Sequence, residues 1–230
     1  MTRPCIQASG GDNARYARRL QEWLSYADRL GDRRVLYLRD RDELPETELA
    51  TLEKTGVVKV GLGRELENYL LDATALAKLI QARKPGKAVQ AEDVTRAMKA
   101  VADGLQQTVI LKRVCRQLVP IRLMETDLRK KLVGQGAGLA ELQQAVAARL
   151  QTSADMNEKI AAFWESAEVS VTASWENRWR ALAPGEEVLK GIWNHFGMGG
   201  YSKLSDGPVI ATEIVEPPAD LTRLLSEFLE

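Results

Sequence analysis

The sequence predicts an α/β region over residues 1–72, built on a partial parallel sheet, followed by a mainly α-helical region over residues 73–230. In the first region short apolar runs alternate with helical stretches, which is typical of a parallel sheet with helical crossovers. Beyond residue 72 most apolar side chains recur at helical spacing. The change in pattern places the expected boundary near residue 72.

Three short apolar runs are the expected strands of the sheet, at residues 4–8, 35–38 and 57–60. A helix is expected before the second strand, because apolar side chains recur at helical spacing over residues 20–30. Pro45 opens the next helix, where its missing N–H costs nothing, and Gly56 follows the end of that helix. These elements follow one another as strand, helix, strand, helix, strand.

The second region is expected to consist of helices joined by proline and glycine breaks. Helical segments are predicted at residues 64–71, 73–82, 92–119, 139–150, 153–164, 185–196 and 219–229, while residues 168–183 are left unassigned. Pro120 ends or kinks the longest of them, and residues 197–207 form a glycine-rich loop. The glycines at 134–138 lie between helices rather than after a strand, so they indicate a linker.

Composition narrows the class of protein. Lys plus Arg and Asp plus Glu both number 32, and this balance excludes the strongly basic character of a nucleic-acid coat protein. Cys5 and Cys115 lie too far apart for a disulfide framework or a zinc site, and the single histidine, His195, excludes a histidine-rich metal site. No window is long and apolar enough for a membrane span. We expect a cytoplasmic protein without membrane contact.

Two aspartates at the end of a strand are the first candidate site. Asp40 and Asp42 follow the apolar run at residues 35–38. Residues two apart in an extended segment point the same way, and parallel sheets gather functional groups at the carboxyl ends of their strands. The pair either faces one divalent ion, with oxygen ligands of the kind magnesium prefers, or forms a solvated charged turn or helix cap.

Glu67 is the second candidate. It follows the next strand, in the segment RELENYLL at residues 64–71, and so belongs to the same expected sheet edge as Asp40 and Asp42. Either it completes a carboxylate cluster with them, or the segment is the start of an ordinary amphipathic helix with exposed glutamates. Arg39 and Arg41 flank the aspartates and either hold DNA phosphates or compensate the nearby negative charge.

The stretch VLYLRDRDE, then a helix, VVKV and GRELENYLLD, resembles the later part of a TOPRIM domain. The variant it resembles is that of the OLD-family nucleases and related AAA-ATPase-associated TOPRIM proteins of bacterial phage defence. The resemblance covers residues 5–75 best, including the opening IQASGGDN, and extends loosely to the C-terminal residues 184–225.

The resemblance implies a nuclease that cleaves DNA with Mg²⁺ or Mn²⁺. By position Asp40, Asp42 and Glu67 would be metal ligands, with Glu67 also catalytic. Lys190 would stand near the scissile phosphate, and Lys203 is an alternative for that role and a DNA contact. The partners implied are DNA, an AAA- or ABC-type ATPase and a second copy of the chain.

One departure from the family pattern concerns the first strand and its glutamate. A TOPRIM domain begins with a strand ending in Glu-Gly, and no such segment precedes Ile6. Three explanations fit this departure: the chain is a fragment, a partner supplies the missing TOPRIM half, or the activity is lost. The ATP-binding motif GxxxxGK[ST] is also absent from the sequence. The alternative function is therefore a non-catalytic helical interaction module that docks a partner ATPase or nuclease half.

Overall fold

The computed structural model describes residues 13–27, 35–42, 44, 46–54, 56–118, 144 and 156–229. The chain divides into two compact units. The first combines residues 1–103 with residues 180–230, and the second comprises residues 104–179. The change of pattern near residue 72 is therefore not a boundary between these units, because helices on either side of it pack in the first unit.

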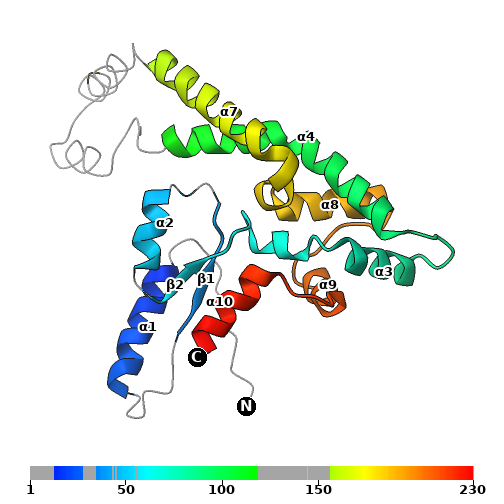
Figure 1. Ribbon diagram of the computed structural model, residues 1–230, viewed down its shortest axis with the longest axis horizontal. Helices are drawn as coiled ribbons and strands as arrows, with labels where there is room; N and C mark the ends of the chain where they lie inside the picture. Colours follow the sequence, from blue (N-terminus) through cyan, green and yellow to red (C-terminus); the bar gives the residue numbers. More distant parts are fainter. Residues whose placement is uncertain are drawn as a thin grey trace. The chain divides into compact units, whose positions relative to one another are not determined.

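The first unit contains a two-stranded parallel sheet (Figure 1). Strand β1 (Tyr37–Arg39) pairs with β2 (Val58–Val60), and Leu38 lies opposite Lys59. This parallel pairing confirms a mixed α/β architecture for the first region. The expected strand at residues 4–8 lies outside the described residues.

Two helices flank the strands in the sequence. Helix α1 (Asn13–Ala27) is linked to the start of β1, because the Gln21 side chain accepts a hydrogen bond of 2.8 Å from the Val35 backbone N–H. Helix α2 (Glu46–Glu53) packs on β2. Its Leu49 forms a small core with Leu44 and Val60, which explains why the apolar residues of this short segment face inward.

A second group of helices in the first unit carries most of its buried side chains. After β2 come a 3₁₀ helix, η1 (Leu66–Leu70), and helix α3 (Ala73–Arg83). Asp72 caps the N-terminus of α3, because its carboxylate accepts a hydrogen bond of 2.7 Å from the Ala75 N–H. Helices α8 (Gly185–His195), α9 (Asp206–Glu213) and α10 (Ala219–Leu229) return from the other end of the chain. The fully buried side chains of this group and of the first part of α4 (Ala91–Leu118) include Leu76, Ile80, Val94, Met98, Val188, Leu189, Ile192, Trp193 and Ile210.

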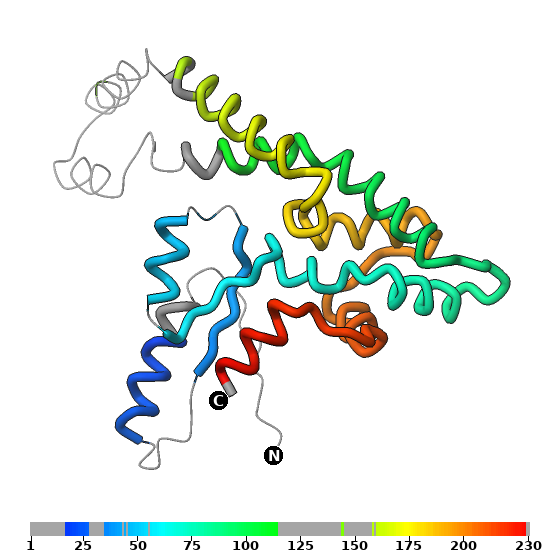
Figure 2. The backbone as a smooth tube through the Cα atoms, viewed as in Figure 1, coloured from blue at the N-terminus to red at the C-terminus, as the bar shows by residue number. Residues whose placement is uncertain are grey.

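Segments far apart in the sequence meet in this group. Helix α8, orange in Figure 2, lies beside η1, in cyan, and α9 packs against α3. Residues 168–182 of the unassigned stretch belong to a helix, α7 (Met156–Leu182). The predicted helix at residues 92–119 is confirmed as α4 (Ala91–Leu118). The single 3₁₀ helix replaces the longer helix expected over residues 64–71.

The second unit is built from the later part of α4 and most of α7. Gln106 and Thr172 are hydrogen-bonded at 3.5 Å, and Arg113 donates to Ser170 at 3.3 Å. Val109, Val114, Val171 and Trp175 supply buried apolar surface. None of the helices in the described ranges is both long and apolar enough to cross a membrane.

Candidate functional site

The carboxyl ends of β1 and β2 place Asp40 and Asp42 beside the segment that follows β2. The Asp40 carboxylate accepts a hydrogen bond of 2.7 Å from the Leu66 backbone N–H. The Asp42 N–H donates to the Arg64 carbonyl oxygen at 2.8 Å. Asp42 has a φ of 44°, a left-handed conformation that aspartate tolerates better than most residues. Two hydrogen bonds therefore tie the aspartate turn to the start of η1.

The 3₁₀ helix that follows buries Glu67. Its N-terminus is closed by a capping box, in which the Asn68 side chain accepts the Glu65 N–H at 2.7 Å and the Glu65 side chain accepts the Asn68 N–H. Glu67 is 3% exposed. The interpretation of this segment as a helix start with exposed glutamates is therefore wrong for Glu67.

Helix α8 and the residues just before it pack against η1. The Asn68 carboxamide donates to the Ala183 carbonyl at 2.8 Å, and the Glu65 carboxylate accepts the Glu186 N–H of α8 at 3.1 Å. Gly185 makes the close approach possible, because a Cβ there would lie 2.6 Å from the Asn68 backbone nitrogen. The backbone that carries Glu67 is thus held by contacts to the C-terminal part of the chain.

Lys203 reaches Glu67 from the loop between α8 and α9. Its ammonium forms an ion pair with the Glu67 carboxylate. The loop is anchored by Asp206, which is 6% exposed and accepts hydrogen bonds from the Ser202 N–H at 2.7 Å and from the Arg83 guanidinium at 2.8 Å. The glycine-rich loop is therefore held at its second half by defined hydrogen bonds.

The charges of this cluster affect one another. Partial burial raises the pKa of the Asp40 carboxyl, and the neighbouring carboxylates of Asp42 and Glu67 raise it further, against the opposing effects of the Leu66 N–H and the Lys203 ammonium. Burial lowers the pKa of Lys203, but the ion pair with Glu67 and the charge of Asp40 outweigh this, so the net pKa of Lys203 is raised. We define Asp40, Asp42, Glu67 and Lys203 as the carboxylate–lysine cluster.

An aromatic residue borders this cluster. Burial raises the pKa of Tyr201 to about 12, and the charges of Glu67, Asp206 and Glu186 add to the effect. The Tyr201 ring contacts Trp193 edge to face, with the ring centroids 5.2 Å apart. Trp193 is fully buried, so this contact joins Tyr201 to the core.

The other predicted site residues lie differently. Lys190 projects from the exposed side of α8 and pairs with Glu186 and Glu187 of its own helix, at 2.9 and 2.8 Å. The hydrogen bonds that its ammonium donates to Glu187 and Glu186 raise the pKa of Lys190. Arg41 forms an ion pair with Glu46 at the surface. Arg39 belongs to β1, where its carbonyl accepts the Gly61 N–H at 3.4 Å. The structure thus brings Lys203, and not Lys190, to Glu67.

Several supporting residues were not expected from the sequence. Asp206 and Tyr201 carry no motif, and their positions depend on contacts with residues more than a hundred positions earlier in the chain, such as the Asp206–Arg83 ion pair. Asn68 stands inside the RELENYLL segment, but its hydrogen bonds to the Arg180 and Ala183 carbonyls have no local signal.

The donor chemistry of the cluster fits a hard divalent cation. Asp42 and Glu67 both act electrostatically on Asp40, and the three carboxylates offer oxygen ligands of the kind that Mg²⁺ and Mn²⁺ prefer. Within the ranges that the structure describes, however, no three His, Cys, Asp or Glu side chains are arranged so that they could hold a metal ion. Instead, the positive charge next to Glu67 is the Lys203 ammonium.

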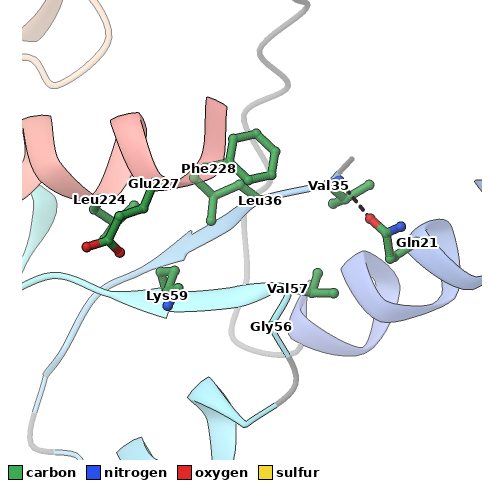
Figure 3. A pocket seen from close by; sticks show the side chains of 9 residues that line it. All are labelled: Gln21, Val35, Leu36, Gly56, Val57, Lys59, Leu224, Glu227 and Phe228. Atoms are coloured by element: carbon green, nitrogen blue, oxygen red, sulfur yellow. Dashed lines mark hydrogen bonds between the residues drawn. The ribbon is translucent and has the colours of Figure 1, made fainter. Parts of the chain in front are cut away.

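A cavity of about 380 Å³ lies at the opposite, amino end of the strands (Figure 3). Its walls come from α1, the starts of both strands and α10, with Val57, Leu224 and Phe228 among the apolar lining and Lys59 and Glu227 among the polar lining. The carboxylate–lysine cluster does not line it. The candidate site is therefore the cluster at the carboxyl ends of the strands.

Comparison of the chain with protein-family models, with curated proteins and with solved structures gives no match.

Proposed function

We propose that this chain is a TOPRIM-type, divalent-metal-dependent DNA endonuclease module of a bacterial defence or DNA-processing system. The single observation that carries the proposal is the position of Glu67. It is buried after β2, interacts with Asp40 at the end of β1 and pairs with Lys203. A buried carboxylate beside two others and a basic side chain is characteristic of functional sites rather than of solvated surface.

The residues of the cluster have separate roles in the proposed reaction. A bound Mg²⁺ or Mn²⁺ would polarise the phosphodiester and stabilise the attacking and leaving oxygens. Asp40, Asp42 and Glu67 would hold the cation. The Leu66 N–H orients Asp40, and the Arg64 carbonyl holds the turn on which Asp42 lies. Lys203 binds the negative charge of the phosphate.

DNA would approach across the surface next to this cluster. Lys203 is about half exposed, with 47% of its side chain accessible, so its ammonium is within reach of a phosphate in solvent. Arg41 is paired with Glu46 at the surface, and a surface ion pair exchanges readily for a phosphate. Arg39 lies one residue before the aspartate turn. These three side chains are the proposed DNA contacts.

The test is cleavage of supercoiled plasmid by the full chain in Mn²⁺ and in Mg²⁺. We expect nicking with either ion, and a loss of about 100-fold or more in Asp42→Asn and Glu67→Gln. Asn is chosen at position 42 because it tolerates the positive φ. Asp103→Asn, which removes a carboxylate from an exposed ion pair on α4, is the matched control. A folded chain without cleavage in either ion, or equal cleavage by Glu67→Gln, would contradict the proposal.

A second candidate is a non-catalytic module that docks a partner ATPase or nuclease half. The observation that favours it is the exposed side of α1, where Trp23 is 61% and Tyr26 88% exposed. Such a module would bind its partner unchanged in Glu67→Gln and more weakly in Trp23→Ala. Light scattering of the purified chain, alone and with Trp23→Ala, measures self-association through the same surface.

A further inference from the structure

The Glu67–Lys203 ion pair joins a buried group to a solvent-accessible one. Only 4% of the Glu67 side chain is exposed, against 47% of the Lys203 side chain. The carboxylate is thus held inside the protein, and the lysine side chain approaches it from the surface. Lys203 can therefore move away from the pair without leaving a buried cavity, whereas Glu67 cannot.

Glu67 needs a cation beside it. A buried carboxylate without a partner is strongly unfavourable, and here the neighbouring carboxylate of Asp40 adds repulsion. The basic groups Arg41, Arg64, Arg83 and Lys190 form ion pairs with Glu46, Glu65, Asp206 and Glu186, respectively. The positive charge paired with Glu67 is the ammonium of Lys203.

The backbone around Lys203 is anchored independently of that ion pair. Ser202 and Asp206 exchange hydrogen bonds of 2.7 Å, one from the Ser202 N–H to the Asp206 carboxylate and one from the Asp206 N–H to the Ser202 carbonyl. The Met198 N–H donates to the Trp193 carbonyl at 2.8 Å at the other end of the loop. Because the loop has its own hydrogen bonds, the flexible four-carbon side chain of Lys203 can leave Glu67 while the loop stays folded.

We infer that Lys203 is a resident counter-ion, which a divalent cation displaces from Glu67. In the metal-free protein the ammonium neutralises Glu67. When Mg²⁺ or Mn²⁺ binds the carboxylates, the ammonium is repelled and released towards solvent, where the phosphate of the substrate takes it up. Cation binding and exposure of the phosphate-binding lysine are thereby coupled. The inference rests on the proposed function, because it assigns the order of events at the same cluster.

Direct titration of the full chain with Mn²⁺, followed by calorimetry, tests this exchange without any cleavage assay. The first variant is Lys203→Met, whose side chain is close to lysine in length but uncharged. Lys203→Gln is used instead if the Met variant does not fold. Lys99→Met removes a lysine from an ion pair with Asp103 on α4 and is the matched control. Competition between two cations for one carboxylate predicts that Lys203→Met binds Mn²⁺ about 5-fold or more tightly than the wild type.

Thermal unfolding of the same variants gives a second measurement. Without metal, Lys203→Met is expected to unfold at a lower temperature than Lys99→Met, because Glu67 loses its counter-ion. Saturating Mn²⁺ is expected to raise the midpoint of Lys203→Met by more than it raises the wild type.

The outcomes separate the inference from the proposed function. Wild-type binding of Mn²⁺ that is lost in Glu67→Gln, together with equal or weaker binding by Lys203→Met, would overturn the counter-ion role and leave the metal site standing. Absence of Mn²⁺ binding in the wild type and in Lys203→Met would overturn both. Tighter binding by Lys203→Met alone supports the exchange.

Discussion

The Asp40 carboxylate and the Leu66 backbone N–H form a hydrogen bond of 2.7 Å that joins the end of β1 to the start of η1. Because Glu67 is the next residue, this bond fixes the position of the buried glutamate relative to the aspartate turn. The hydrogen bond stabilises the ionised form of Asp40, while partial burial and the two other carboxylates disfavour it. Asp40 is therefore held in position at a cost to its ionised form.

Asp40→Asn is expected to stabilise the metal-free protein at pH 7. Asparagine keeps an oxygen for the Leu66 N–H but removes the charge. Since the pKa of Asp40 is raised above its ordinary value of 3.8 in the folded state, the wild type loses stability as the pH rises from 3.8 through that raised pKa. The advantage of the variant should shrink as the pH falls towards 3.8, in urea unfolding measured at several pH values.

The matched control for that series is Asp103→Asn, which removes an exposed carboxylate of α4. Its effect should vary little over the same pH range. A lower stability of Asp40→Asn than of the wild type at pH 7 would show that the Asp40 charge is favourable in the folded protein, contrary to the raised pKa.

Asn68→Asp should destabilise the first unit by about 1–3 kcal/mol. The substitution keeps an oxygen for the Glu65 N–H but removes the amide donor that bonds the Arg180 and Ala183 carbonyls, at 2.6 and 2.8 Å. It also places a negative charge against those two carbonyls. Urea unfolding followed by tryptophan fluorescence measures the change, and a loss below about 0.5 kcal/mol would mean that these bonds contribute little.

Gly185→Ala tests the close approach of α8 to η1. The added Cβ would meet the Asn68 nitrogen at 2.6 Å and the Glu67 carbonyl carbon at 2.8 Å, and backbone atoms cannot move aside as a flexible side chain does. We expect a loss of stability of about 1–3 kcal/mol from overpacking. Gly200→Ala is the control, since no atom lies within 4 Å of its Cβ position. Equal midpoints of thermal unfolding for the two variants would contradict the packing.

Tyr69→Phe removes a hydroxyl that links the segment after β2 to α10. This hydroxyl donates to the Asp220 carboxylate at 2.6 Å and accepts the Leu62 N–H at 3.1 Å. The expected loss is about 1 kcal/mol. Burial, followed by the contact with Asp220, raises the pKa of Tyr69 to about 12. Absorbance titration should therefore lose one late-ionising tyrosine in the variant, and loss of an early-ionising one would place Tyr69 in solvent.

Local signals predicted several elements of the first unit. The apolar runs around Leu38 and Val58 gave the parallel strand pair, and helical spacing of apolar residues gave α4 and α8. These predictions succeeded because hydrophobic periodicity acts over a few residues. The same reasoning missed the 3₁₀ helix at 66–70, whose short length follows from hydrogen bonds and packing against α8.

The sequence by itself determined the candidate residues of the site: two aspartates after a strand, a glutamate after the next, and lysines near the C-terminus. Only the tertiary structure decided which of them meet. Lys190 lies on a helix, where glutamates three and four residues away hold its ammonium, whereas Lys203 lies in a loop that α3 and α9 bring to Glu67. The burial of Glu67 depends in the same way on α8, because long-range packing, not local spacing, removes a carboxylate from water.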